Sequence, residues 1–376
     1  MRFDLLHTFA NAAGAPWRQV LERGRRRIAL ADELGLDGFW LGEHHFDHAG
    51  QDQSPNPVLL LADLASRTER IRVGTAAVIL PLWHPLRLAE DLAALDNMVD
   101  GRLDVALSRG ILQAEIINLN AEADRKDPER SKAIFEEFLG LLRTAWSQDP
   151  LAWKSERFEV PNPDTNWPGA LAGPYTDDEG RATGLAILPR PAQTDGPRLY
   201  SVTDTPDGFA TAARQGLDVI TWFPTGGVLD RLNTVYAETV AGNGGPASAA
   251  PRSCAVLRRM HVARTDEEAR AAVEGAVTST VEYISKVRGL GIWLDEGESV
   301  DDPAVQGKAP FDLLFERDHL LVGSPETVAE KMTSMVRDRH VDHFVMSPYL
   351  TEDEQAVEAS LRLCATEVIP AVKWLY

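Results

Sequence analysis

Three ionisable side chains follow a short apolar run near the N-terminus. Residues Phe39–Leu41 form that run, which is too short for a helix and rich in strand-forming residues, so it predicts a buried strand. Glu43, His44 and His45 come one glycine later. An imidazole that titrates near neutral pH can take up or release a proton in a reaction. The structural alternative is that one histidine packs under a loop, with Glu43 as its hydrogen-bond partner.

Other unusual residues also fall within or just after predicted strands. They are Ala76 and Ala77, Ser108-Arg109-Gly110, Thr203-Asp204-Thr205, and Trp222. The two alanines are small enough to let a flat ligand approach the backbone. If the strands are parallel, all these residues lie on one rim together with His44, and that rim is the expected place for chemistry.

Strand and helix patterns alternate along the whole chain. The predicted strands are Phe3–Phe9, Asp37–Leu41, Ile71–Leu80, Leu103–Leu107, Leu199–Thr203, Leu217–Phe223, Ser253–Ala263 and Val341–Ser347. The predicted helices are Trp17–Leu34, Val58–Thr68, Leu86–Val99, Glu129–Trp146, Asp207–Arg214, Val228–Ala241, Glu267–Lys286, Pro325–Asp338 and Glu352–Val368. Eight strands that alternate with helices predict an α/β fold, a (β/α)8 TIM barrel, as a single domain over 1–376. A doubly wound open sheet is the alternative, although no Gly-x-Gly-x-x-Gly follows the first strand.

Two stretches interrupt the alternation and are interpreted as insertions within the domain. Residues 150–197 contain repeated prolines that forbid a long helix but leave room for a small hairpin. Residues 289–318 are rich in glycine and acidic residues, and we expect a loop without regular structure that closes as a mobile lid. Its apolar residues, expected to form a seal, are Ile292, Trp293, Leu294 and Phe311. An ordered surface excursion is the alternative.

Composition excludes several classes of partner. The chain has 376 residues and a net charge of −19, which argues against nucleic acid or an anionic membrane as the main partner. No apolar run reaches the length of a membrane span. The first residues begin directly as a strand without the pattern of a signal peptide, so a cytoplasmic location is expected. Cys254 and Cys364 stand alone, and no metal site is predicted.

Several motifs, in order, carry a resemblance to a known family. They are Glu43-His44-His45-Phe46, Val73-Gly74-Thr75-Ala76-Ala77, His84-Pro85-Leu86-Arg87, Gly101-Arg102-Leu103, Ser108-Arg109-Gly110, Leu188-Pro189-Arg190-Pro191-Ala192-Gln193 and Val322-Gly323-Ser324-Pro325-Glu326. The chain resembles the bacterial luciferase-like, flavin-dependent monooxygenases through most of its length. That resemblance implies a (β/α)8 barrel. It also implies reduced flavin, usually FMN, which reacts with O2 to give a C4a-hydroperoxide.

The resemblance assigns expected roles to individual residues. His44 matches the catalytic histidine, while Glu43 and His45 are expected to orient it or to pack. Arg109 matches a ligand of the flavin phosphate, which suits a guanidinium fork, and Lys132 is the second basic partner. For Arg109 the structural alternative is a salt bridge, and for Lys132 it is a solvated surface position.

The remaining cofactor contacts come from the third, fifth and sixth strands. The turn Thr203-Asp204-Thr205 offers hydroxyls and helix N-terminal amides to phosphate, or it simply caps the helix. Ala76 and Ala77 are expected to share a cis peptide in a bulge under the flavin, and Trp222 is expected to wall the flavin ring. Two departures stand out: Gly208 replaces a usual serine, and Ser108 replaces the cysteine of the light-emitting enzymes.

Three functions remain open at this point. The first is a two-component monooxygenase that receives reduced FMN (FMNH2) from a separate flavin reductase and oxygenates a small organic or natural-product substrate. The second is an F420-dependent oxidoreductase on the same fold. The third is a non-catalytic flavin-binding subunit. A homodimer is expected for the first function, whereas the third includes a stabilising subunit of a heterodimer.

Overall fold

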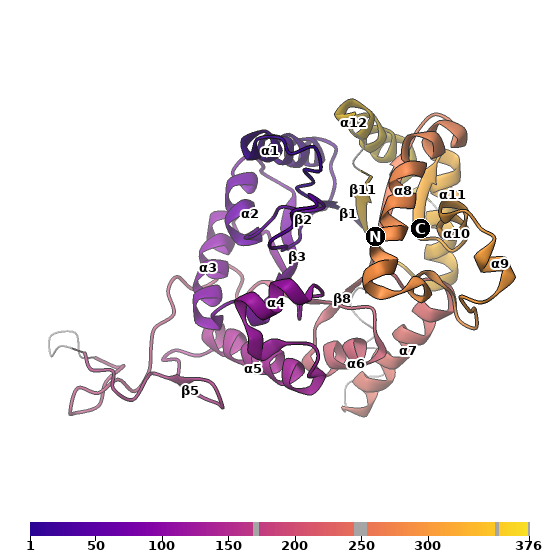
Figure 1. Cartoon of the computed structure of the whole chain (residues 1–376). Helices are drawn as coiled ribbons and strands as arrows, with labels where there is room; N and C mark the ends of the chain where they lie inside the picture. The colour runs from indigo at the N-terminus through magenta and orange to yellow at the C-terminus, as the bar shows by residue number, and fades with distance from the viewer. Residues whose placement is uncertain (168–172, 244–253, 350–352, 375–376) are drawn as a thin grey trace.

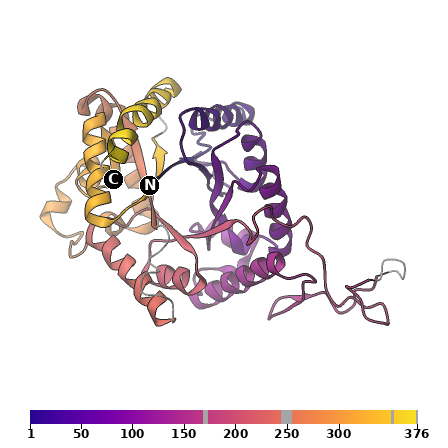
Figure 2. The same ribbon diagram turned by 180° about the vertical axis from the view of Figure 1, so that it is seen from behind.

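The computed structural model describes residues 1–167, 173–243, 254–349 and 353–374. Its main sheet closes on itself, because β8 pairs with β9, and all of its strand pairs are parallel. The ring consists of β1 (Arg2–His7), β2 (Gly38–Leu41), β3 (Arg72–Ile79), β4 (Leu103–Ser108), β7 (Arg198–Val202), β8 (Asp218–Thr221), β9 (Cys254–Val262) and β11 (His343–Pro348). The predicted (β/α)8 barrel is therefore confirmed, and helices surround the strands in both ribbon views (Figures 1 and 2).

The helices between the strands follow the predicted order. They are α1 (Trp17–Glu33), α2 (Pro57–Ala65), α3 (Pro85–Met98), α5 (Pro128–Ser147), α6 (Pro206–Gln215), α7 (Gly226–Gly242), α8 (Asp266–Arg288), α11 (Pro325–Arg339), α12 (Glu354–Leu363), the π-helical turn η5 (Cys364–Val368) and α13 (Ile369–Trp374). Several begin at proline, whose fixed φ and missing N–H suit the first helical turn. Ser253 and Glu352, the predicted starts of a strand and a helix, lie outside the described residues.

The barrel interior is filled by residues that alternate along the strands. They are Leu6, Trp40, Ala77, Ala106, Tyr200, Ile220, Ala255, Leu257 and Val345, with Ala76, Val202 and Trp222 packed against them. Large rings pack against small residues here. A Cβ at Gly74 would lie 2.4 Å from the Trp40 ring, which leaves no room for a side chain. A larger apolar cluster fills the space between the strands and the helices. Side chains that face inward therefore alternate with those under the helices, as in other packed barrels.

Several short elements were missed by the sequence analysis. Helix α4 (Gln113–Leu119), followed by the 3-10 turn η2 (Ala121–Ala123), stands between β4 and α5. Strand β10 (Leu320–Gly323) pairs in parallel with the far end of β9 and lies outside the closed ring. Strand β9 is nine residues long, so it extends past its barrel neighbours and offers β10 a free edge. A four-residue apolar run next to a predicted loop gave no periodic signal of its own.

The first interruption of the pattern forms an arm beside the barrel. Strands β5 (Trp153–Lys154) and β6 (Glu159–Val160) pair antiparallel as the small hairpin expected in 150–197. Isolated bridges join Leu151 to Leu185 and Thr176 to Ala182 further along. The arm projects away from the ring of helices in both ribbon views (Figures 1 and 2).

The second interruption is ordered, so the expectation of a loop without regular structure was wrong. Residues 289–318 contain the 3-10 turn η4 (Leu290–Trp293) and the short helices α9 (Pro303–Gln306) and α10 (Pro310–Glu316). Trp293, Leu294 and Phe311 are buried in a separate apolar cluster with α8 and β10. Apolar residues at helical spacing outweighed the acidic composition. Motion of this segment as a lid stays a prediction.

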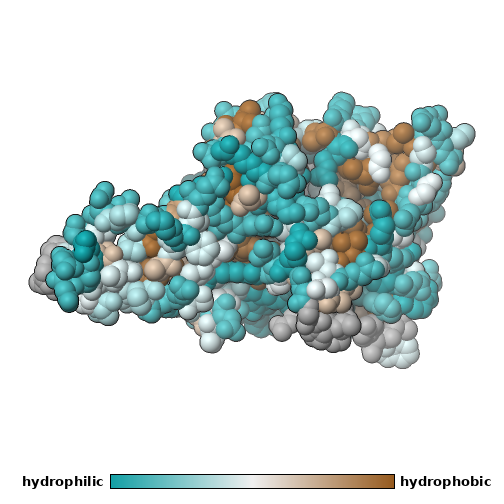
Figure 3. All heavy atoms as spheres, turned by 90° about the horizontal axis from the view of Figure 1, so that it is seen from below, coloured by the Kyte–Doolittle hydropathy of each residue, from teal (hydrophilic) through white to brown (hydrophobic). Residues whose placement is uncertain are grey.

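The outer surface is mainly polar. The face in Figure 3 is mostly hydrophilic, with apolar surface gathered away from the arm. No helix in the described part of the chain is both long and apolar enough to cross a membrane.

Candidate functional site

His44 is held by a carboxylate from helix α4. Its Nδ1 lies 3.0 Å from Glu115 Oε1, and the backbone N–H of His45 donates to the same oxygen at 2.8 Å. Glu115 is fully buried on α4, and its Oε2 has no hydrogen-bond partner among the described residues. A carboxylate accepts the Nδ1 proton, so the Nε2 of His44 is left for a reacting group.

Sequence reasoning missed Glu115. It is 71 positions from His44, and its helix is short and carries no motif. The only available signal was its place after strand four, on the same rim.

The electrostatics around His44 favour its protonated form. Burial by itself lowers the pKa of His44. The hydrogen bond that His44 donates to Glu115 and the negative charges of Asp52, Glu115 and Asp47 outweigh that effect, so the pKa of His44 is raised above its ordinary value. Asp52 is itself buried beside the site, and its Oδ1 accepts from the backbone N–H of Phe9 at 2.9 Å. His44 thus keeps its proton to higher pH than an ordinary imidazole, and it can release that proton to a reaction partner.

Glu43 contacts His45 rather than His44. Its Oε1 lies 2.9 Å from His45 Nε2, and its Oε2 accepts from the backbone N–H of Ile79 at 2.8 Å and from Trp83 Nε1 at 2.9 Å. The buried carboxylate therefore ties the end of β2 to the end of β3. Because the His45 backbone in turn binds Glu115, Glu43 supports the histidine pair indirectly.

The expected cis peptide between Ala76 and Ala77 is present. The pairing of β3 with β4 shifts register between Thr75 and Val78, as a bulge does. Both alanines lie with Trp222 in the interior cluster. A Cβ on Gly42 would meet Ala76 O at 3.5 Å and Asp52 Oδ2 at 3.3 Å, so the bulge lies close to the end of β2.

Three arginines gather near the carboxyl end of β4 without carboxylate partners. Arg109, Arg125 and Arg288 make no ion pair with any described residue. Burial, then the positive charges of Arg109 and Arg288, lower the pKa of Arg125. Their known hydrogen bonds go to carbonyl oxygens, from Arg109 to Pro128 at 3.3 Å and from Arg125 to Gly110 at 2.7 Å. Unpaired guanidinium groups that repel one another are typical of an anion site. Sequence reasoning found Arg109 and missed the other two.

Lys132 and the start of α6 adjoin this basic group. Lys132 Nζ lies 2.6 Å from Asp207 Oδ1. That hydrogen bond is the largest cause of the lowered pKa of Asp207. Burial opposes the shift, and the positive charges of Lys132 and Arg109 add to it. Arg109, Lys132 and the start of α6 are therefore neighbours, and their binding of phosphate stays a prediction.

The side chains of the Thr203–Thr205 turn contact different partners. Thr205 Oγ1 accepts from the backbone N–H of Gly208 at 3.2 Å, so the capping alternative holds. A Cβ on Gly208 would lie 1.8 Å from Thr203 Oγ1. Asp204 Oδ1 accepts from Thr221 Oγ1 at 2.8 Å and from the Trp222 backbone N–H at 2.7 Å. Asp204 thus positions the end of β8, and the half-buried Trp222 stacks on Phe223 with ring centroids 4.5 Å apart.

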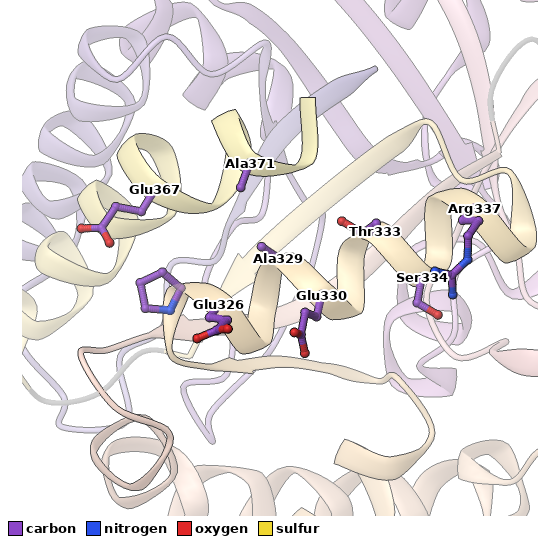
Figure 4. A pocket seen from close by; sticks show the side chains of 9 residues that line it. Glu326, Ala329, Glu330, Thr333, Ser334, Arg337, Glu367 and Ala371 are labelled. Carbon is purple, nitrogen blue, oxygen red and sulfur yellow. The ribbon is translucent and has the colours of Figure 1, made fainter. Parts of the chain in front are cut away.

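A surface hollow of about 660 Å³ lies elsewhere, between α11 and the C-terminal helices (Figure 4). The charged side chains that line it from these helices are Glu326, Glu330, Arg337 and Glu367 (Figure 4). None of the residues predicted for the site lines it. Among the described residues, no group of His, Cys, Asp and Glu side chains could hold a metal ion.

Comparison with known proteins decides the family. The profile of the luciferase-like monooxygenase family matches residues 1–343. The chain belongs to this family. It is 36% identical over 116 residues to the "Flavin-dependent trigonelline monooxygenase, oxygenase component" of Acinetobacter baylyi, a match that spans 31% of this chain and 32% of that protein. It is also 25% identical over 284 residues to the limonene 1,2-monooxygenase of Rhodococcus erythropolis, spanning 73% of this chain and 65% of the relative.

Several solved structures share the fold over nearly the whole chain. The monooxygenase RslO1 from Streptomyces bottropensis has a TM-score of 0.76 at 26% identity, with 98% of this chain and 99% of that chain covered. The oxygenating constituent of 3,6-diketocamphane monooxygenase from Pseudomonas putida, a type II Baeyer-Villiger monooxygenase in complex with FMN, has a TM-score of 0.76 at 20% identity, with 98% of each chain covered. An F420-dependent secondary alcohol dehydrogenase has a TM-score of 0.69 at 16% identity, with 99% and 98% covered. The last two likenesses concern the fold alone.

Proposed function

We propose that this luciferase-like chain is the oxygenating component of a two-component monooxygenase that uses reduced FMN and O2. One observation carries the proposal: the unpaired arginine group and the start of α6 stand on the same rim as the His44–Glu115 pair. An anion site beside an acid/base pair suits a phosphate-bearing cofactor whose reactive part extends toward the histidine. The intact His44–Glu115 pair opposes a non-catalytic subunit.

The residues of the rim fit FMN in three places. Arg109, Arg125 and Arg288 supply charge for a phosphate dianion, and the Thr203 hydroxyl and the first amides of α6 supply donors. The Ala76–Ala77 backbone and the Trp222 ring flank a flat ring system. His44 would exchange a proton through Nε2 while Glu115 fixes its Nδ1. Bound reduced FMN supplies the electrons that activate O2 for transfer of one oxygen atom to an organic substrate.

The partner is a separate flavin reductase, and the substrate is a small organic molecule. The relative from Acinetobacter is named an oxygenase component, which supports a two-protein system. FMN is favoured over F420 because the Glu43-His44-His45 and Ser108-Arg109-Gly110 motifs carry the resemblance to the FMN-using monooxygenases. The expectations of a cytoplasmic homodimer accompany this proposal.

Cofactor binding tests the phosphate site directly. The wild-type chain and Arg109→Ala are titrated with FMN, riboflavin and F420, with Arg337→Ala on the outer face of α11 as the matched control. Losing one charge-assisted contact should weaken FMN binding by about 1–3 kcal/mol, because the phosphate loses a guanidinium partner. Riboflavin lacks the phosphate and should bind both chains equally. Unchanged FMN affinity in Arg109→Ala would contradict the placement, and preferential binding of F420 would favour the second function.

Turnover tests the role of His44. The chain is given chemically reduced FMN, O2 and a panel of ketones and aromatic compounds. His44→Ala should keep FMN binding yet lose oxygenation by roughly 10²–10⁴-fold, as expected for a lost acid/base group. The consumed O2 should then appear as H2O2. Oxygenation by His44→Ala at the wild-type rate would show that His44 is structural.

A further inference from the structure

Arg259 is a cation on the inner face of the barrel that the proposed flavin site does not use. Along β9, Leu257 belongs to the interior cluster, and Arg259 lies two residues further toward the carboxyl end on the same face. Ser347 is its register partner on β11, two residues beyond the interior Val345. Arg259 Nη1 donates to Ser347 Oγ at 2.8 Å. The guanidinium therefore stands at the carboxyl-end layer of the barrel, where catalytic groups of this fold gather.

Two aromatic faces enclose this guanidinium. Its central carbon lies 5.4 Å from the centroid of the Trp222 ring and 5.5 Å from that of Tyr349. The Arg259 side chain remains partly accessible, and its Nε is buried without a hydrogen-bond partner. No described carboxylate lies within ion-pair distance of it. Burial lowers the pKa of Arg259, and the charge of Asp52, which also acts on His44, opposes that shift. Arg259 and His44 thus stand near the same buried acid at the carboxyl ends of the strands.

A structural role accounts poorly for this side chain. The neighbouring Arg258 shows what such a role looks like: it is 1% exposed and donates to the carbonyl oxygens of Trp222, Leu257 and Pro224. Among the described residues both Nε atoms lack a partner, and Arg259 has a single neutral acceptor there, the Ser347 hydroxyl. Desolvating a cation for a single neutral hydrogen bond is unfavourable. A missing anion would complete the arrangement.

We propose that Arg259 binds the anionic oxygen of the substrate, and that the substrate is a small planar organic acid that lies beside the Trp222, Arg259 and Tyr349 side chains. This inference rests on the proposed function, which places the reaction on this rim. A carboxylate would accept from the guanidinium and neutralise it, while an aromatic ring would lie along the two aromatic side chains. Arg259 would then select the substrate and hold it against His44.

A matched pair of probes tests this selection without turnover. The wild-type chain is titrated by calorimetry with 2-naphthoate and with 2-naphthamide, which share ring and shape but differ in charge. Naphthoate should bind at least about ten-fold more tightly, the effect of one charge-assisted hydrogen bond. Arg259→Met, similar in length and uncharged, should abolish that preference, and Arg259→Lys should keep part of it. Arg337→Met, on the outer face, is the control and should change nothing.

Four other binding results would overturn the proposal. Equal binding of the two probes, no binding of naphthoate at millimolar concentration, or a preference that survives in Arg259→Met would show that the guanidinium is not an anion receptor. Displacement of naphthoate by saturating FMN would assign Arg259 to the flavin. Thermal melting of both variants identifies a folding defect, and Arg259→Lys then decides the question. A chain that fails to oxygenate anything would refute the proposed function but leave this binding preference intact.

Discussion

At the scale of residues, the site depends on carboxylates that each bind more than one partner. Glu115 Oε1 accepts from the His44 ring and from the His45 backbone, and Glu43 joins the His45 ring to the end of β3. Fixing an imidazole through one nitrogen sets its orientation and its pKa together. The histidine pair is therefore positioned by buried acids rather than by its own loop.

Substituting Glu115 tests this control of His44. Glu115→Gln keeps the shape but removes the charge, so the pKa of His44 should fall. Because the pKa of His44 is raised in the folded chain, protonated His44 stabilises the folded state at pH values below its unfolded pKa of 6.5. This contribution is lost as the pH rises through the folded pKa. Glu115→Gln should thus lose more stability in acid than in alkali.

Two measurements check this expectation. Proton NMR of the His44 ring follows its titration, and urea unfolding at acid and alkaline pH follows stability. Glu43→Gln is the matched control, because Glu43 bonds His45 and should move the His44 midpoint less. An unchanged midpoint in Glu115→Gln would show that Glu115 does not govern His44.

Residues at strand ends could be predicted, whereas residues that meet them across space could not. His44, Arg109 and the cis Ala76–Ala77 pair follow from strand order together with family motifs. Glu115 and Arg125 lie on short connecting segments with no periodic pattern, and their partners are fixed only when the barrel closes. Such contacts cannot be predicted from the spacing of residues in the sequence.

At the scale of elements, the same contrast applies. The long amphipathic helices and the eight ring strands repeat their apolar pattern often enough to be recognised. Strand β10 has four residues and exists because β9 offers it an edge. Helix α10 was hidden by its acidic surroundings, although Phe311 and Leu314 lie at helical spacing and are buried. Short elements are determined by what they pack against rather than by their own pattern.

The turn from β7 to α6 gives an element-scale prediction. Gly208→Ala should destabilise the fold by about 1–3 kcal/mol, because the new methyl group would overlap Thr203. Thr203→Ala removes the nearest atoms, so the double variant should recover part of the loss. Gly275→Ala on α8 is the matched control: nothing lies within 4 Å of its Cβ position, and it should stabilise the helix by about 0.5–1 kcal/mol. Urea unfolding measures all three, and equal effects of Gly208→Ala and Gly275→Ala would contradict the proposed crowding.

At the scale of the whole molecule, charge and packing are unevenly distributed. The chain carries a net charge of −19, yet Arg109, Arg125 and Arg288 lie together on one rim and form no ion pair with an acidic residue in the described part of the chain. Such a local positive field in an acidic molecule favours anionic ligands at this place over the rest of the surface. Packing differs as well, because the segment 289–318 has a buried cluster of its own whereas the arm has few buried contacts.

This difference in packing predicts where trypsin cuts. Arg181 on the arm is exposed, and its ion pairs with Asp177 and Glu179 are solvent-exposed and worth little. In the segment 289–318, Lys308 contacts Glu316, and Arg317 pairs with Glu298 beside buried apolar residues. Local opening of the arm therefore disrupts less packing.

Mass spectrometry of early fragments should show cleavage after Arg181 before cleavage after Lys308 or Arg317. In Arg181→Gln that fragment should vanish without faster cutting in 289–318. Earlier cleavage at Lys308 or Arg317 would show instead that 289–318 opens readily, as a lid must, and slower cutting there with bound FMN would then tie its closure to the cofactor.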